Sequence, residues 1–374
     1  MHLLILSCNT GEGHNSAAKA LRHYALDRGD TCDIQDALAF WTPEASKIIS
    51  KGHVFLYRHF PKLFGVGYRF EENHPPKDGD ESIMYTLVKK GCEDLSAFLL
   101  QGGYDAVICT HLFPAMMMTE LRRNGSIKLP TYFVATDYSS YPGVGEIEVD
   151  RCFIAHPDLI QEYIQCGIPK EKLVASGIPV HPNFYRGVSQ QEARRLLHLP
   201  QDKKIVLLMS GSMGCGPIKE LTVQLPKALP KDVQLVAICG NNRRLANFLT
   251  RNDPPENLTV VGYTVRMPLY MDAADLYITK PGGLSSTEAV AKRLPLIFID
   301  AVPGCESKNL DFFAAQGIAE SRSSVEDLIN LICTACADDE KLANVSAKMA
   351  TFLPTPATET IYQYLCKDVL RENH

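Results

Sequence analysis

The sequence predicts an α/β protein made of two Rossmann-like, doubly wound parallel-sheet domains that face a cleft. Short apolar runs alternate with segments of helical periodicity, which is typical of a parallel sheet covered by helices. This series of elements starts twice, and each start opens on a glycine-rich loop. A stretch rich in proline and glycine separates the two series and predicts a domain boundary.

The first series covers residues 1–182. Residues 3–7 form a short apolar strand, and helical periodicity then continues until Gly29, which ends the helix. Residues 176–182 (SGIPVHP) cannot continue a regular element and predict a linker. The other strands expected before this linker are residues 105–109, 131–135 and 151–155.

The second series covers residues 183–355. It opens with a short helix at residues 190–199, and the strand of residues 204–209 then leads into a second glycine loop. Residues 356–374 carry a last helix, near residues 359–370, which could cross back onto the first domain. The later strands are expected at residues 234–239, 258–261, 276–278 and 296–299.

Composition narrows the possible functions. A net charge of -5 and a pI near 6.1 argue against a nucleic-acid partner, because broad nucleic-acid binding needs a basic excess. The 12 cysteines have irregular spacing and lie mostly in apolar runs, which favours reduced thiols over disulfides. No secretion signal precedes the first strand, and no apolar run reaches the roughly 18 residues that span a bilayer. We therefore expect a cytoplasmic protein whose membrane contact is peripheral.

The most informative segment is residues 280–289 (KPGGLSSTEA). Gly282 and Gly283 stand between an apolar strand and a helix that is expected to start at Ser285. Unpaired N–H groups and the helix dipole make such a helix start a favourable site for phosphate. Glu288 would lie one turn into the helix, within reach of the hydroxyls of an attached sugar. Together with a second glycine loop near residue 10, this segment suggests an enzyme that uses a nucleotide sugar.

That second loop is residues 9–14 (NTGEGH). Gly11 and Gly13 first suggest a dinucleotide site, but Ser16 occupies the position of the third glycine and argues against it. Alternatively, the loop lets an acceptor or a sugar approach the backbone, with His14 acting as a base or hydrogen-bonding a phosphate. A histidine that only caps the helix is the simpler interpretation.

Three further loops follow predicted strands. The hydroxyl of Ser212 could donate to a diphosphate, and backbone groups of residues 262–267 (GYTVRM) could bind a uracil edge. Arg266 could meet a phosphate. Glu306 and Asn309 come after another strand, where they could hold sugar hydroxyls. Ordinary turns, or a surface arginine, would explain the same residues without a ligand.

Two other features concern metals and membranes. Residues 78–80 (DGD) resemble an Asp-x-Asp metal motif but lie in a charged, proline-rich stretch, so a surface turn explains them better and we expect no metal cofactor. The Cys-x-x-Cys of residues 333–336 is only half a zinc site. Residues 40–70 interleave aromatic and basic side chains, which suits an anionic membrane surface, although helices packed on their own domain would show the same pattern.

The chain resembles glycosyltransferase family 28, and within it the branch of the monogalactosyldiacylglycerol synthases and processive diacylglycerol glucosyltransferases. The motifs that carry the resemblance occur in order along nearly the whole chain: TGEGH at 10–14, THLFP at 110–114, ATD at 135–137, SGIPV at 176–180, TKPGGLSSTEA at 279–289 and PGCE at 303–306. Two positions differ from the branch. Asp137 is followed by YSSYPG in place of histidines and a tryptophan, and Cys305 replaces a glutamine.

This resemblance implies a GT-B fold and inverting transfer from a UDP-sugar. Glu288 would bind the ribose, while Glu306 and Asn309 would hold the hexose, either galactose or glucose. The first domain, with His14 and residues 40–70, would take a lipid acceptor such as diacylglycerol and dock on an anionic membrane. The residues implied for the diphosphate are Gly283, Leu284, Ser285 and Ser286, and those implied for phosphate and uracil are Ser212, Gly262, Tyr263 and Val265.

Inverting transfer needs a base, for which His14 is the first candidate, Asp137 the second and His111 the third. Two other functions remain open at the sequence level. One is a UDP-sugar epimerase of the same fold, and the other is a nucleotide-sugar-binding protein that has lost catalysis. A transferase with another lipid acceptor or a soluble acceptor would also fit.

Overall fold

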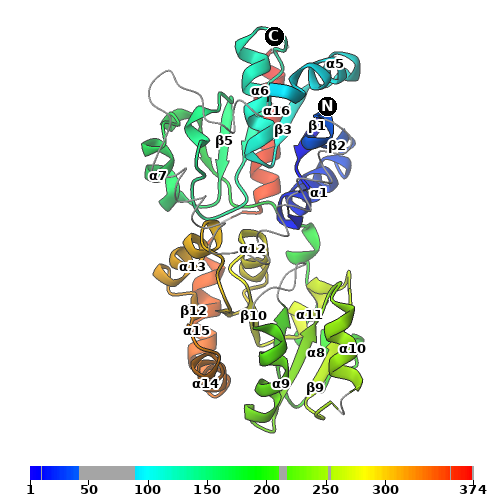
Figure 1. Ribbon diagram of the computed structural model, residues 1–374, viewed down its shortest axis with the longest axis vertical. Coiled ribbons are helices and arrows are strands. Elements are labelled where there is room, and N and C mark those ends of the chain that lie inside the picture. Colours follow the sequence, from blue (N-terminus) through cyan, green and yellow to red (C-terminus); the bar gives the residue numbers. More distant parts are fainter. Residues whose placement is uncertain (10, 42–88, 210–216, 252–253, 354, 373–374) are drawn as a thin grey trace. The chain divides into compact units, whose positions relative to one another are not determined.

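The computed structural model describes residues 1–9, 11–41, 89–209, 217–251, 254–353 and 355–372. The chain forms two compact units, coloured by sequence in Figure 1. The first unit contains Met1–Pro182, Val302–Cys305 and Thr355–His374. The second contains Asn183–Ala301 and Glu306–Pro354. Each unit is built on its own parallel sheet.

The first sheet has the strand order β2-β1-β3-β4-β5-β6, and every pair of neighbours is parallel. In β1, Leu3 and Ile5 face one side of the sheet and Leu4 and Leu6 face the other, and all four are buried. Both faces are therefore covered, as expected for a parallel sheet. The strands are β1 His2–Ser7, β2 Thr31–Asp36, β3 Ala106–Cys109, β4 Thr131–Val134, β5 Arg151–Ile154 and β6 Leu173–Ala175.

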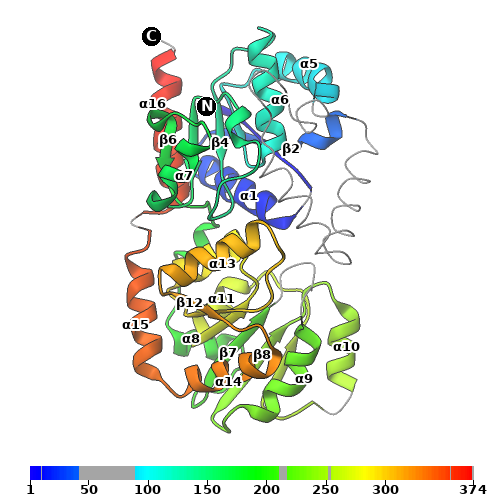
Figure 2. The same ribbon diagram turned by 60° about the vertical axis from the view of Figure 1, so that its left-hand side comes forward.

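The last helix of the chain completes the core of this first unit. In α16, Ala357, Ile361, Leu365 and Val369 are buried against residues of β1, β3, β4, β5 and α1. Figures 1 and 2 both show α16, in red, beside the blue α1. Among its described residues the α-helices are α1 Glu12–Leu26, α5 Cys92–Gly102, α6 Leu112–Arg123, α7 Ile160–Gln165 and α16 Ala357–Glu372.

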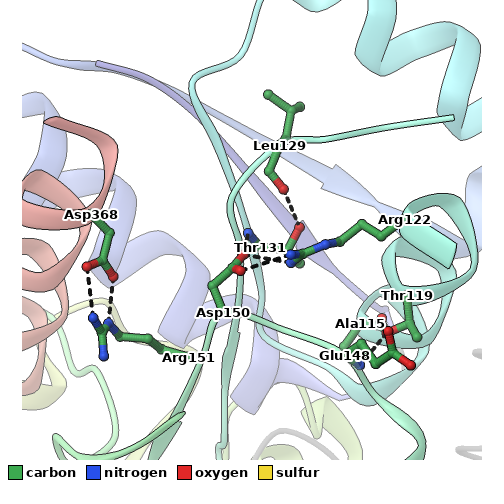
Figure 3. Close-up of polar contacts among 9 residues, drawn as sticks. All are labelled: Ala115, Thr119, Arg122, Leu129, Thr131, Glu148, Asp150, Arg151 and Asp368. Atoms are coloured by element: carbon green, nitrogen blue, oxygen red, sulfur yellow. Dashed lines mark hydrogen bonds and ion pairs between the residues drawn. The ribbon is translucent and has the colours of Figure 1, made fainter. Parts of the chain in front are cut away.

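Two bidentate ion pairs attach α16 and α6 to the first sheet (Figure 3). Arg151, at the start of β5, binds Asp368 of α16 in a bidentate pair, with Nε–Oδ2 at 2.5 Å and Nη2–Oδ1 at 2.9 Å. Arg122 of α6 binds both carboxylate oxygens of Asp150 at 2.6 and 2.9 Å, and Asp150 also accepts from the N–H of Thr131. Because both pairs are bidentate and partly buried, they set the positions of α16 and α6.

The second sheet has the strand order β12-β11-β10-β7-β8-β9, again with all neighbours parallel. Its core forms where β7, β8, β10 and β11 meet α9, α10 and α14. The strands are β7 Lys204–Met209, β8 Val233–Ile238, β9 Leu258–Val261, β10 Leu276–Thr279, β11 Leu296–Phe298 and β12 Ala319–Ser321. The helices are α8 Gln190–Leu196, α9 Ile218–Ala228, α10 Arg243–Arg251, α11 Met267–Ala273, α12 Gly283–Lys292, α13 Cys305–Ala315, α14 Val325–Cys336 and α15 Asp339–Ala350.

The predicted α/β class with two doubly wound parallel sheets is confirmed. Three details of the prediction were wrong. Helix α12 begins at Gly283 and not at Ser285, because Gly282 takes an extended conformation (φ -76°, ψ 138°) and already serves as the N-cap. Helix α1 likewise begins at Glu12, so the first glycine loop is shorter than predicted. Helix α8 ends at Leu196, before His198, whose φ of 55° stops the helix.

Candidate active site

The strand order of each sheet places its ligand loops. In a doubly wound sheet, ligands bind at the carboxyl ends of the strands, where the strand order reverses. The second sheet reverses between β7 and β10, and β10 leads directly into Lys280–Gly282 and α12. The first sheet reverses between β1 and β3, which are followed by α1 with His14 and by α6 with His111. Topology thus brings the predicted residues to the expected edge of each sheet.

The N-terminus of α12 has backbone N–H groups that could bind an anion. No side chain caps this helix, so the N–H groups of Gly283, Leu284 and Ser285 have no intrahelical acceptor. The hydroxyls of Ser285 and Ser286 donate backwards to the carbonyl of Gly282, at 3.2 and 2.8 Å. Ser286 is fully buried, so its side chain holds the turn together. The backbone N–H groups remain the donors that a phosphate would use.

Two contacts made by side chains of α13 hold this glycine turn in place. Asn309 of α13 is fully buried and donates from Nδ2 to the carbonyl of Pro281 at 2.9 Å. Lys280 is also buried and binds the carboxylate of Glu306 at 3.2 Å. Asn309 and Glu306, the two residues predicted to hold a hexose, therefore already hold the turn. Sequence reasoning missed Lys280, although a lysine directly after a buried strand was the available signal.

Glu288 lies in the second turn of α12, because the helix starts earlier than predicted. Burial raises the pKa of this carboxyl to about 8. Burial, and to a smaller extent the nearby carboxylate of Glu288, also raise the pKa of the Tyr277 hydroxyl on β10. A carboxyl group in such a place loses hydration and is best satisfied by donors from a ligand.

The loop after β9 has an open surface. Tyr263 is 70% exposed and Val265 is 80% exposed, so their backbone groups are accessible. Arg266 donates from Nη2 to the carbonyl of Leu196 at 3.0 Å, which directs it towards α8. Gly262 directly follows β9 and precedes Tyr263. Ser212 lies outside the described residues, as do residues 42–88, which include residues 78–80 and most of residues 40–70.

In the first unit, His14 lies in the first turn of α1. Its Nδ1 atom is 2.9 Å from the carbonyl of Thr110 and 2.8 Å from the hydroxyl of Thr136. Gly11 is the N-cap, and a Cβ at Gly11 or at Gly13 would meet no described atom within 4 Å. Packing among the described residues therefore does not explain these two glycines, whereas a ligand that approaches the backbone would.

His111 has a different role from His14. It is the N-cap of α6, and its Nδ1 accepts a hydrogen bond from the N–H of Phe113 at 3.1 Å. An accepting Nδ1 requires the proton of the neutral ring to be on Nε2. The capping role that the sequence raised for His14 thus falls to His111, whose ring packs edge-on against His14 at 4.6 Å.

Asp137, the other candidate base, follows β4. Its Oδ2 accepts from the hydroxyl of Tyr141 at 3.2 Å, and the same hydroxyl accepts from the backbone N–H of Thr136 at 2.9 Å. Burial and the adjacent carboxylate hold the pKa of Tyr141 well above its usual value, so the phenol stays protonated. Thr136 and Tyr141 were missed at the sequence level: the contact of Thr136 with His14 spans 122 residues, and the contacts of Tyr141 depend on how the segment after β4 turns back on itself.

Within the described chain, no cluster of metal-binding side chains occurs and no helix is long and apolar enough to cross a membrane. The described cysteines, including Cys333 and Cys336, are free thiols.

Solved structures match almost the whole chain. Acinetobacter baumannii MurG covers 98% of this chain and 99% of its own, with a TM-score of 0.64 and 17% identity. The S. aureus MnaA-UDP co-structure covers 97% of this chain and 95% of its own, with a TM-score of 0.61 and 13% identity. Together with the two doubly wound sheets and the anion-ready helix α12, these matches define the class: the fold is GT-B, that of a large group of glycosyltransferases.

Family models narrow this class. The model for monogalactosyldiacylglycerol (MGDG) synthase matches residues 14–180, and the glycosyltransferase family 28 C-terminal domain matches residues 205–355. A processive diacylglycerol β-glucosyltransferase of Bacillus pumilus is 28% identical over 96% of this chain and 93% of its own length. The chain belongs to glycosyltransferase family 28, in the branch of these lipid glycosyltransferases, and is itself a glycosyltransferase.

Proposed function

We propose that this enzyme transfers a hexose from UDP-galactose or UDP-glucose to diacylglycerol or a related lipid, with inversion, in glycolipid synthesis. The uncapped N-terminus of α12, with Glu288 one turn further along, is the observation that carries the donor half of this proposal. The acceptor half is supported by the relatives, which are named for transfer to diacylglycerol.

The chemistry follows from the charges that develop. The acceptor oxygen forms a bond to C1 of the hexose, while the bond from C1 to the phosphate oxygen breaks and UDP leaves with that electron pair. The N–H groups of Gly283, Leu284 and Ser285 would stabilise the negative charge as it grows on the leaving diphosphate. Glu288 would accept hydrogen bonds from the ribose. These donors can hold the diphosphate without a metal ion, so no cofactor is assigned.

The acceptor hydroxyl must lose its proton to a base, and we assign this role to His14. Its Nδ1 lies 2.9 Å from the carbonyl of Thr110, so the neutral ring carries its proton on Nδ1 and would accept a second proton at Nε2. His111, whose Nδ1 accepts from the backbone, would carry its proton on Nε2 and is less suited to this role. We expect His14→Ala to lower kcat about 100-fold while UDP affinity changes little. Normal turnover by this variant would refute the assignment.

The deciding experiment is a panel of UDP-sugars assayed against diacylglycerol in mixed micelles and read by mass spectrometry. A lipid product that gains one hexose mass from one UDP-hexose supports the proposal. A new sugar epimer formed without acceptor would show an epimerase, and UDP binding without any product would show a binding protein. Flotation with anionic vesicles tests the second expectation, a cytoplasmic enzyme that docks on a membrane: no binding would favour a soluble acceptor.

A further inference from the structure

His14 and Asp137, two candidates for one role, are the ends of a single hydrogen-bond chain. The chain runs from His14 Nδ1 to the hydroxyl of Thr136 at 2.8 Å, on to the hydroxyl of Tyr141 at 3.4 Å, and from there to Asp137 Oδ2 at 3.2 Å. All four residues belong to the first unit: His14 lies in the first turn of α1, the helix after β1, and the other three lie in the segment that follows β4.

The direction of the donors can be assigned from groups that only accept or only donate. The carbonyl of Thr110 only accepts, so His14 Nδ1, at 2.9 Å, must carry a proton, and the Thr136 hydroxyl accepts a share of it. In a neutral imidazole with a proton on Nδ1, the Nε2 atom is unprotonated. His14 is therefore held in the tautomer that a base acting through Nε2 requires.

The other end of the chain is fixed in the same way. The hydroxyl of Tyr141 accepts from the backbone N–H of Thr136, so its own proton is free to point to the carboxylate of Asp137. The hydroxyl proton of Thr136 then points to the oxygen of Tyr141. Every donor in the chain thus points towards Asp137, and a negative charge there favours a positive charge on the imidazole.

We propose that Thr136 and Tyr141 are positioning residues that connect Asp137 to His14 and make the two an indirect acid–base pair. When the acceptor hydroxyl gives its proton to Nε2 of His14, the chain stabilises the imidazolium, and Asp137 keeps its charge throughout. This inference rests on the proposed function, since it presumes that His14 receives that proton. It gives a role to Tyr141 in the segment YSSYPG that follows Asp137.

The first test compares two variants that each remove one tyrosine hydroxyl. Tyr141→Phe breaks the chain but keeps the edge-on ring contact with Phe133, whose centroid is 6.0 Å away. Tyr104→Phe is the matched control, because its hydroxyl also donates to a carboxylate, that of Asp33 at 3.1 Å. We expect Tyr141→Phe to lower kcat about tenfold, to change the donor KM less than about twofold, and to shift the acidic limb of the kcat profile to lower pH. A profile that matches the Tyr104→Phe control would overturn the inference.

The second test needs neither donor nor lipid, so it separates failure of this inference from failure of the proposed function. Nitrogen-15 NMR of the histidine rings, with His14 assigned by comparison with His14→Ala, should show protonated Nδ1 and unprotonated Nε2. The ring of His111 also packs on His14 and titrates beside it, so its signals are followed in parallel. In Tyr141→Phe and in Asp137→Asn the titration midpoint of His14 should fall, and the double variant should fall no further than Asp137→Asn alone. The opposite tautomer, or additive shifts, would contradict the chain.

Discussion

Glu288 is a carboxyl group whose surroundings oppose its charge. Burial raises its pKa to about 8, so at neutral pH most free molecules carry it protonated. The ribose hydroxyls of UDP would donate to this group and favour its ionised form. Such a residue lowers the stability of the free protein but contributes to its affinity for the ligand.

The first prediction concerns stability. The carboxyl titrates near 4.5 in the unfolded chain and near 8 in the folded protein, so the folded state binds more protons across this window. The free energy of unfolding of the wild type should therefore fall as the pH rises from 4.5 to 8. Glu288→Gln lacks this loss, and we expect it to be more stable than the wild type at pH 8 by up to about 4 kcal/mol.

Urea unfolding at pH 5 and at pH 8 measures this difference. Glu326→Gln, at an exposed position in the first turn of α14, is the control and should give no such pH-dependent gain. An equal gain for Glu288→Gln at both pH values would show that burial does not raise the pKa of this carboxyl.

The second prediction concerns the ligand. If UDP favours the ionised carboxyl, binding at pH 7 should release close to one proton more from the wild type than from Glu288→Gln. Isothermal titration calorimetry in two buffers of different ionisation enthalpy counts these protons. UDP affinity should depend on pH between 6 and 8 differently in the two proteins: the terminal phosphate of UDP titrates in both, and the wild type should show an additional rise from Glu288. Equal proton release by both proteins would remove Glu288 from the ribose site.

At the scale of elements, the attachment of α16 to β5 gives the third prediction. The pair of Arg151 and Asp368 is bidentate and partly buried, so removal of one partner leaves an uncompensated charge. We expect Arg151→Met and Asp368→Asn each to lower the free energy of unfolding of the first unit by about 2 kcal/mol. The double variant should cost less than the sum, as measured in a double-mutant cycle. Additive losses would mean that the pair makes no net contribution.

The strands show how far the sequence alone reaches. Strands β7 and β9 were predicted to the residue, because each is a run of mostly apolar and β-branched residues that ends at a turn residue. Strands β2 and β12 were missed because polar residues interrupt them, and β6 was missed because it has only three residues. The order of the strands was also out of reach, since it depends on pairings between distant segments.

The site shows the same limit. His14, His111 and Glu288 could be proposed from the sequence because each follows a predicted strand and carries a side chain suited to binding or proton transfer. The tautomer of His14 depends on Thr136, which is 122 residues away in sequence, and no local pattern signals that contact. Helix starts were displaced because glycine caps lack the side-chain signature that marks most N-termini.

At the scale of the whole molecule, each unit has its own hydrophobic core, so UDP should stabilise the unit that binds it more than the other unit. UDP at about 100 times its Kd stabilises the unit that binds it by about 2.7 kcal/mol. Hydrogen exchange should then slow in α12 and in the loop after β9, whereas β1 and the start of α1 should exchange as in the free protein. Mass spectrometry of peptic peptides measures this difference. Equal protection in the His14 segment would place part of the UDP site in the first unit.

The return of α16 to the first sheet also has a consequence for synthesis on the ribosome. Domains usually fold in the order in which they emerge. Here β1 to β6 emerge early, but the apolar face that Ile361 and Leu365 cover stays open until α16 has been translated. The second unit needs no later segment for its core, so it can close first. A nascent chain of this enzyme therefore exposes part of one face of its first sheet until translation is nearly complete, and we expect chaperones to bind there.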